Sequence, residues 1–158
     1  MPSITLQEAD LLLKLYEMRR EPRLRQARAW FTDNFNATTM PELMALCPAG
    51  SDNNAFMRQV LSYWEMCASF VNRGLIDEEF FFENTGEQWL VFERFKPVLA
   101  DLRTTFKSPL FLVNLEKHVK RLEDWRERNA PGSLAATREW MKQQAAARAA
   151  KAASNTGS

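Results

Sequence analysis

Helical periodicity in residues 54–83 limits this chain to a small set of folds. From Phe56 to Val71 the apolar side chains recur every three or four positions, which is the spacing of one helix face. The apolar stripe covers about half of the helix circumference, more than the roughly 100° typical of a surface helix. Gly74 then marks a helix end, and Asp77 heads an acidic first turn. We therefore expect a central helix packed on two sides, followed by a short aromatic-rich helix.

The rest of the chain keeps the helical period, and no segment alternates as a strand does. Helix starts are marked by a capping-box pattern at Thr5 and by the pair Ser108-Pro109. The sequence predicts an all-α fold, with a single compact bundle of about six helices in residues 1–130. Residues 131–158 are rich in alanine and end in a polar tail. We expect them to form a projecting or frayed helix with a disordered end.

Composition and charge exclude several classes of protein. The chain has 158 residues, 46% of them hydrophobic, and a formal net charge of +1, so bulk charge favours neither nucleic acid nor membrane. It has no run of about eighteen apolar residues and no apolar leader, so we expect no membrane span and no signal peptide. The two cysteines, Cys47 and Cys67, are not spaced as a metal or redox motif. We predict a cytoplasmic protein with reduced thiols.

Most enzyme templates are missing from the sequence. It contains no glycine-rich phosphate loop, no paired-histidine motif, no calcium loop and no nucleophile elbow. We therefore predict no catalytic, cofactor-binding or metal-binding residues, and we favour a protein that is not an enzyme.

A candidate pocket is formed by Trp64, Cys67 and His118. His118 is the only histidine and lies on the apolar face of its predicted helix. It is either a buried general base or, as we favour, a neutral core histidine. Cys67 lies on the apolar stripe of the central helix, where burial disfavours a thiolate, and we interpret it as a core residue. A cavity beside these three side chains would indicate a small-ligand sensor or an enzyme.

The first helix and the segment after it provide a candidate interface. The first helix has two apolar faces, which indicates deep burial or a partner on the second face. Residues 19–28 contain five arginines, which could bind an anion such as nucleic acid. The arginines straddle a proline break, however, so we favour a solvated surface with local salt bridges. The candidate interface residues are Leu11, Leu15, Met18, Arg19, Arg23 and Arg25.

Glu65 and Arg103 each lie among large apolar residues on their own predicted helices. A lone charge in such a place is costly, so we expect the two to meet as a partly buried ion pair that fixes helix register. That role is structural. Most tryptophans are interpreted as core residues, although Trp30 and Trp140 could anchor an interface.

The order of features from Tyr63 onward resembles a known family. The shared pattern is Tyr63-Trp64-Glu65, then Arg73-Gly74-Leu75-Ile76-Asp77-Glu78, an aromatic run at 80–82, and later Trp89, Pro97, Arg103 and Phe111-x-x-x-Leu115-Glu116. This pattern is similar to that of a bacterial family catalogued as a domain of unknown function, number 4760, over about residues 10–126. The resemblance implies an all-α fold and assigns no activity or site residue. Many members begin with a membrane helix, from which this chain departs.

The leading expectation is therefore a cytoplasmic, non-catalytic helical module that binds another protein or a second copy of itself. One alternative is nucleic-acid or anion binding through residues 19–28, supported by the basic C-terminal helix. The other is a small-ligand sensor or enzyme with its pocket near His118.

Overall fold

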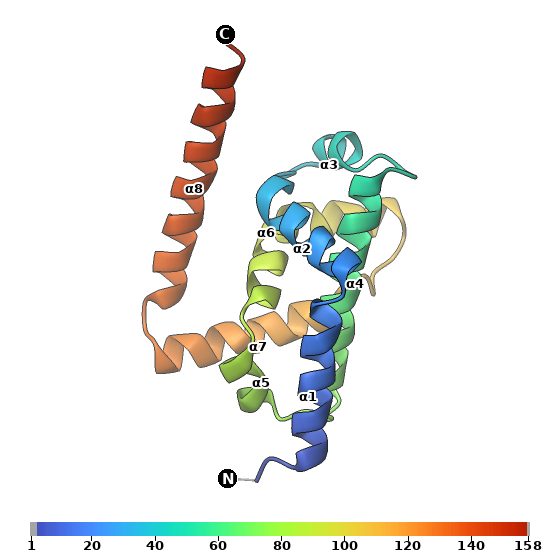
Figure 1. Cartoon of the computed structure of the whole chain (residues 1–158), viewed down its shortest axis with the longest axis vertical. Coiled ribbons are helices and arrows are strands. Elements are labelled where there is room, and N and C mark those ends of the chain that lie inside the picture. Colours follow the sequence, from blue (N-terminus) through green and yellow to red (C-terminus); the bar gives the residue numbers. More distant parts are fainter. Residues whose placement is uncertain (1–2, 158) are drawn as a thin grey trace. The chain divides into compact units, whose positions relative to one another are not determined.

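The computed structural model describes residues 3–157, and within this range the chain forms eight helices and no strand (Figure 1). The fold is all-α, as predicted. The helices are α1 (Leu6–Arg19), α2 (Pro22–Asn34), α3 (Met40–Leu46), α4 (Asp52–Asn72), α5 (Glu78–Asn84), α6 (Glu87–Thr105), α7 (Val113–Asn129) and α8 (Ser133–Asn155). Seven of these helices, α1–α7, lie in residues 1–130, where about six were expected.

The chain divides into two compact units, the first ending at Lys120 and the second beginning at Arg121. The division falls inside α7. Across residues 3–157, no helix has both the length and the apolarity needed to cross a bilayer.

The starts of α1, α4 and α5 are set by side chains close in sequence. Thr5 and Glu8 form the predicted capping box: the Glu8 N–H donates to Thr5 Oγ1 at 3.1 Å, and the Thr5 N–H donates to Glu8 Oε2 at 2.8 Å. Ser51 caps α4 through the Asn54 N–H, and Asp77 caps α5 through the Phe80 N–H. These local contacts explain why the sequence predicts the helix starts well.

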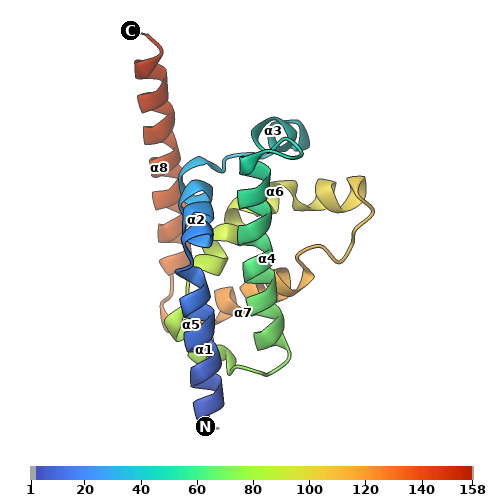
Figure 2. The same cartoon turned by 45° about the vertical axis from the view of Figure 1, so that its right-hand side comes forward.

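Helix α4 is the central element of the first unit. It buries nine residues, and α2 lies alongside it (Figure 2). Aromatic rings fill much of the core: Phe31 stacks on Phe35 with ring centroids 4.5 Å apart, and Phe35 contacts Phe95 at 5.7 Å. The two-sided burial predicted for this helix is confirmed.

The connection between α6 and α7 differs from the prediction. Ser108-Pro109 does not begin a helix; residues 108–112 form turns, and α7 begins at Val113. Leu112 lies directly before the helix with φ of 56°, a left-handed conformation that L-residues rarely adopt. The helix start is displaced because side chains from α4 and α6 bind this segment, and a local pattern cannot reveal such contacts.

The second unit contains the C-terminal part of α7 and the whole of α8. Gly132 joins them with φ of 80°, which glycine adopts without strain. Arg138 of α8 donates to Glu123 of α7 at 2.8 Å, and Arg126 donates to Thr137 Oγ1 at 3.3 Å. These contacts join the two helices. Helix α8 is continuous to Asn155 and mostly exposed.

Candidate ligand site

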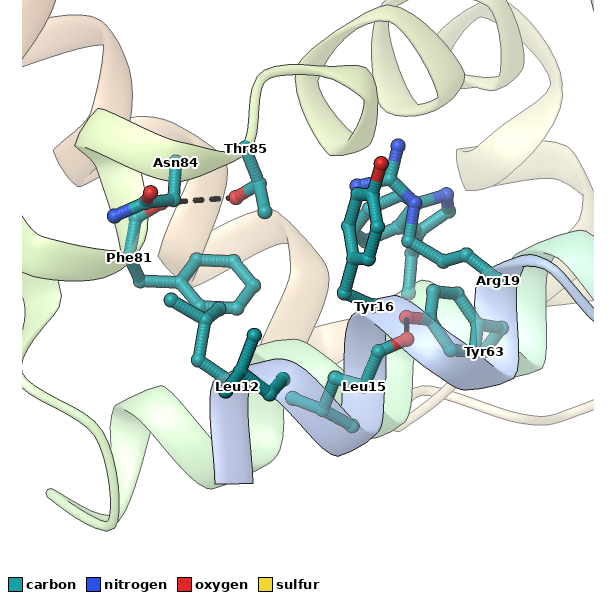
Figure 3. Close-up of a pocket in the computed structure, with 10 residues that line it drawn as sticks. Leu12, Leu15, Tyr16, Arg19, Tyr63, Phe81, Asn84 and Thr85 are labelled. Atoms are coloured by element: carbon teal, nitrogen blue, oxygen red, sulfur yellow. Dashed lines mark hydrogen bonds between the residues drawn. The ribbon is translucent and has the colours of Figure 1, made fainter. Parts of the chain in front are cut away.

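A pocket of about 230 Å³ lies in the first unit between α1, α4 and α5. Helix α1 provides the largest share of its wall, through Leu12, Leu13, Leu15, Tyr16 and Arg19. These side chains share a face because Leu12, Leu15, Tyr16 and Arg19 are spaced by one turn or less. Figure 3 shows Tyr16 and Arg19 on α1, with Phe81, Asn84 and Thr85 on the other side of the pocket.

Helix α1 is held against the pocket by polar contacts. The Tyr63 hydroxyl of α4 donates to the Leu15 carbonyl at 2.5 Å, within a buried site (Figure 3). Burial raises the pKa of Tyr63 well above its usual range, so the phenol keeps its proton and remains a donor. Near the other end of α1, Glu8 accepts a hydrogen bond from the Asp77 N–H at 2.9 Å. The position of α1 is therefore fixed at two points.

The α5 wall is apolar at its base and polar at its rim. Phe81 is buried, whereas Asn84 is exposed. The Thr85 hydroxyl donates to the Phe81 carbonyl at 3.0 Å and accepts from Gln88 Nε2 at 3.0 Å. The hydrogen-bonding capacity of the Thr85 hydroxyl is therefore taken up within the protein. Polar contacts to a ligand are better sought on the α1 and α4 side of the pocket.

The Arg19 guanidinium lies close to two aromatic rings. Its carbon is 5.5 Å from the centroid of the Tyr16 ring and 5.2 Å from that of the Trp64 ring, distances typical of cation–π contacts. Only 16% of the side chain is exposed.

Glu87 is shared by Arg19 and Arg28. Arg28 Nε donates to Glu87 Oε1 at 2.8 Å, and Arg28 Nη2 also donates to Glu87 Oε2. This bidentate hydrogen bond to Glu87 raises the pKa of Arg28. Arg19 Nη2 reaches the same carboxylate only at 3.5 Å. Two guanidinium groups thus share one carboxylate, which leaves a local surplus of one positive charge.

Two N–H donors on pocket residues have no acceptor. Trp64 Nε1 and Arg19 Nε are both buried, and neither makes a hydrogen bond within residues 3–157. The Trp64 side chain is only 1% exposed. An unmade hydrogen bond of this kind costs about 1–3 kcal/mol, and such atoms in a native protein call for an explanation such as a bound ligand. Both residues line the pocket, so the missing acceptor is best sought there.

The profile of a protein family described as a domain of unknown function, DUF4760, matches residues 4–122. The chain belongs to this family. No curated protein and no solved structure matches the chain. The matched range of the DUF4760 domain contains every residue of the pocket described above.

The expected pocket of Trp64, Cys67 and His118 is only partly present in the DUF4760 domain. Trp64 lines the cavity, but Cys67 and His118 do not. Burial raises the pKa of Cys67 to about 12, so its thiol stays protonated. His118 is fully buried, with its ring 5.4 Å from that of Phe81 and its Nε2 3.4 Å from Gln88 Nε2. Neither side chain lines the pocket between α1, α4 and α5.

The candidate interface residues on α1 differ in burial. Leu15 is buried, Leu11 is half-buried and Met18 is exposed. Leu15 is therefore unsuitable as a contact residue, because its place is in the core. Arg19 belongs to the pocket.

The arginines after α1 are engaged within the first unit to different degrees. Arg23 lies 4.5 Å from the centroid of the Phe56 ring and 3.5 Å from Asp52. Arg25 is exposed and lines a second, shallower hollow of about 270 Å³ together with Arg28 and Glu87. Of the interface tryptophans, Trp30 is half-buried against Phe31, Phe35 and Phe56, whereas Trp140 of the second unit is exposed.

Glu65 and Arg103 have different partners from the ones expected. Glu65 accepts from the backbone N–H groups of Asn114 and Leu115 at 3.0 and 2.7 Å. Arg103 donates through Nε and Nη2 to the Phe111 carbonyl at 2.9 and 2.8 Å, and pairs with Glu116 at 3.2 Å. The two side chains do not contact each other. Both instead bind the segment of residues 111–116. Their role is structural, and only the predicted pairing was incorrect.

Sequence reasoning missed Tyr16 and Glu87 as site residues. Tyr16 and Arg19 are three residues apart on α1, so their shared face was a usable signal. Glu87 is 59 residues from Arg28 in the sequence, and nothing local links them. In the described residues, no group of three histidine, cysteine or acidic side chains is placed to hold a metal ion.

Proposed function

We propose that this DUF4760 domain is a non-catalytic binding protein whose ligand is a small, largely apolar molecule held between α1, α4 and α5. The observation that carries the proposal is the pair of buried donors, Trp64 Nε1 and Arg19 Nε, without acceptors in a pocket wall. A mostly apolar cavity with a few convergent polar groups is the usual form of a small-molecule site. The proposal includes a reducing, cytoplasmic setting, supported by the free and buried thiols of Cys47 and Cys67.

The lining residues favour binding over catalysis. They include no carboxylate, histidine or cysteine. The Tyr63 phenol is held in its protonated form by burial and already donates to the Leu15 carbonyl. A pocket without a group that exchanges a proton near neutral pH is poorly suited to acid–base chemistry.

The pocket also accounts for side chains that suggested a protein interface. Leu13 is 59% exposed and Tyr16 51% exposed, and both line the pocket. Residues at the mouth of a pocket are expected to be exposed to this degree. A protein partner is therefore not needed to explain the exposure of Leu13 and Tyr16. A nucleic-acid site is less favoured because Arg19 and Arg28 share Glu87, and Arg23 lies beside Asp52.

The proposal is tested by nuclear magnetic resonance of the ¹⁵N-labelled protein. The chain has five tryptophans, so the indole N–H groups give a small set of signals, and the variant Trp64→Phe identifies that of Trp64. The protein is titrated with a panel of small aromatic and branched aliphatic acids and amides. We expect members of the panel to shift the Trp64 signal, because a ligand in the pocket supplies its missing acceptor.

A blocked pocket provides the matched comparison. Leu12 is a half-buried lining residue, so Leu12→Trp fills the cavity, whereas Leu6→Trp adds the same bulk at a position 86% exposed. Binding should be lost in the first variant and kept in the second. If no compound shifts the Trp64 signal at millimolar concentration, or if Leu12→Trp binds as the unaltered protein does, the proposal is incorrect.

A further inference from the structure

We infer that the ligand is a small monocarboxylate with a ring-sized or branched apolar body, whose carboxylate accepts hydrogen bonds from Arg19 Nε and Trp64 Nε1. This inference rests on the proposed function and adds the chemical class of the ligand.

The charge of the ligand follows from the sharing of Glu87. Arg28 makes two contacts with this carboxylate, while Arg19 makes only one, at 3.5 Å. Arg19 is therefore weakly compensated, although its side chain is only 16% exposed. A poorly hydrated cation in such a place favours an anion over a neutral acceptor, because charged hydrogen bonds are stronger when water is excluded. One surplus positive charge matches one negative charge on the ligand.

The position of the head group follows from the free edges of the two donors. The guanidinium of Arg19 is within cation–π distance of the rings of Tyr16 and Trp64. Its Nε edge has no acceptor, and neither has the indole N–H of Trp64. A carboxylate has two oxygens and about four lone-pair sites, so a single head group can serve both donors.

The apolar walls favour a carboxylate over a phosphate. A phosphate ester carries close to two negative charges at neutral pH. The pocket offers one surplus cation, and its remaining walls include Leu12, Leu15 and Phe81. A second charge would lose its water without gaining a partner, which is strongly unfavourable. The site is therefore suited to a monoanion.

The volume of the pocket sets the size of the ligand. An engineered apolar cavity of about 150 Å³ holds a benzene molecule. The present pocket, at about 230 Å³, has room for such a ring and a head group of a few atoms. An aryl-acetic acid or a short branched fatty acid fits this description, whereas a long-chain lipid does not.

The test compares each acid with its uncharged amide, which has nearly the same shape. Phenylacetate and 4-methylpentanoate are titrated beside phenylacetamide and 4-methylpentanamide, with dissociation constants taken from the shift of the Trp64 indole signal. We expect each acid to bind at least about tenfold more tightly than its amide, because hydrogen bonds to a charged group are worth more than neutral ones. Benzylphosphonate at alkaline pH, where it is a dianion, should bind more weakly than phenylacetate.

Two pairs of variants assign the donors. Arg19→Gln should remove the preference for the acid, whereas Arg23→Gln, at an exposed arginine of the next helix, should keep it. Trp64→Phe should weaken binding of the acids about tenfold, read by calorimetry because the indole signal is lost. Trp89→Phe applies the same change to a fully buried tryptophan that does not line the pocket, and should leave affinity unchanged. A thermal unfolding scan of each variant verifies that it is folded.

The outcomes separate the inference from the proposal on which it rests. If acids and amides bind equally, and Leu12→Trp abolishes both, the pocket is a ligand site but the carboxylate class is incorrect. The same conclusion follows if Arg19→Gln keeps the preference for acids. If neither class shifts the Trp64 signal, both the inference and the proposed function fail.

Discussion

The carboxylate of Glu65 on α4 caps α7, accepting a 2.7 Å hydrogen bond from the backbone N–H of Leu115. It also accepts from the backbone N–H and the side-chain amide of Asn114, both at 3.0 Å. The residue before the helix, Leu112, has no polar atom in its side chain and cannot cap it. The cap comes instead from 50 residues earlier in the chain, and it joins the central helix to α7. The negative charge also suits the positive end of the α7 dipole.

Replacing Glu65 should therefore destabilise the first unit. We expect Glu65→Ala to lower the free energy of unfolding by about 2 kcal/mol, since it removes a charged cap and leaves two backbone donors without their acceptor. Chemical denaturation followed by circular dichroism measures this change. Glu17→Ala, at an exposed position within α1, is the matched control and should change stability by less than about 0.5 kcal/mol. An equal effect of the two variants would contradict the role of the cap.

The contrast between Thr5 and Glu65 shows which parts of the fold the sequence can predict. The Thr5 capping box needs only Glu8, three residues away, and the prediction was confirmed. Glu65 was expected to pair with Arg103, but its partners, the N–H groups of Asn114 and Leu115, depend on how α4 and α7 meet. Arg103 could have balanced it and instead binds the Phe111 carbonyl. Caps formed within a helix are encoded locally, whereas contacts between helices depend on packing that periodicity does not describe.

Lys107 occupies a position that normally favours glycine. Both α4 and α6 end in a Schellman pattern: Gly74 and Leu75 donate to the carbonyls of Val71 and Phe70, while Lys107 and Ser108 donate to those of Thr104 and Arg103. The residue that adopts the left-handed conformation is Gly74 after α4, with φ of 74°, and Lys107 after α6, with φ of 50°. A left-handed conformation costs a non-glycine residue about 1 kcal/mol.

Replacing this lysine should increase stability. We expect Lys107→Gly to raise the free energy of unfolding by about 0.5 kcal/mol, the relief of strain being partly offset by the greater freedom of glycine in the unfolded chain. The reverse change, Gly74→Lys, should lower it by about 1 kcal/mol. Paired denaturation curves measure both. If Lys107→Gly is neutral or destabilising, the strain assigned to this turn is incorrect.

The buried thiol of Cys67 should make stability depend on alkaline pH. Burial raises its pKa to about 12 in the folded protein, against about 8.5 in an unfolded chain. Between these values the folded state holds a proton that the unfolded state has lost, so stability falls as pH rises. We expect a loss of about 1 kcal/mol per pH unit above about pH 8.5. Urea unfolding at several pH values measures the slope, which Cys67→Ala should reduce; an unchanged slope would exclude Cys67 as its source.

The ligand pocket could not be predicted from the sequence, because its walls come from different helices whose packing periodicity does not describe. Trp64 lines the pocket, but its expected companions Cys67 and His118 are buried and do not line it. The real companions, Tyr16 and Arg19, come from α1, whose two apolar faces suggested a protein interface. Both faces contribute to the pocket wall, one through Leu15 and the other through Leu12, Leu13 and Tyr16. Apolar periodicity gives the same signal for a packed contact and for a pocket wall.

Glu87 connects the stability of the first unit to the charge of its pocket. Glu87→Gln removes the carboxylate that Arg19 and Arg28 share, at a site where all three side chains are at most one-fifth exposed. We expect a loss of about 2 kcal/mol in the free energy of unfolding, because two poorly hydrated cations are left without a counter-charge. The same change should increase the affinity for phenylacetate several-fold, since the ligand no longer competes with Glu87 for Arg19. Calorimetry on Glu87→Gln, on Arg19→Gln and on the double variant separates these effects: the gain in affinity should disappear in the double variant, because it requires the Arg19 guanidinium. A gain that persists without Arg19 would indicate that Arg28, not Arg19, receives the anion.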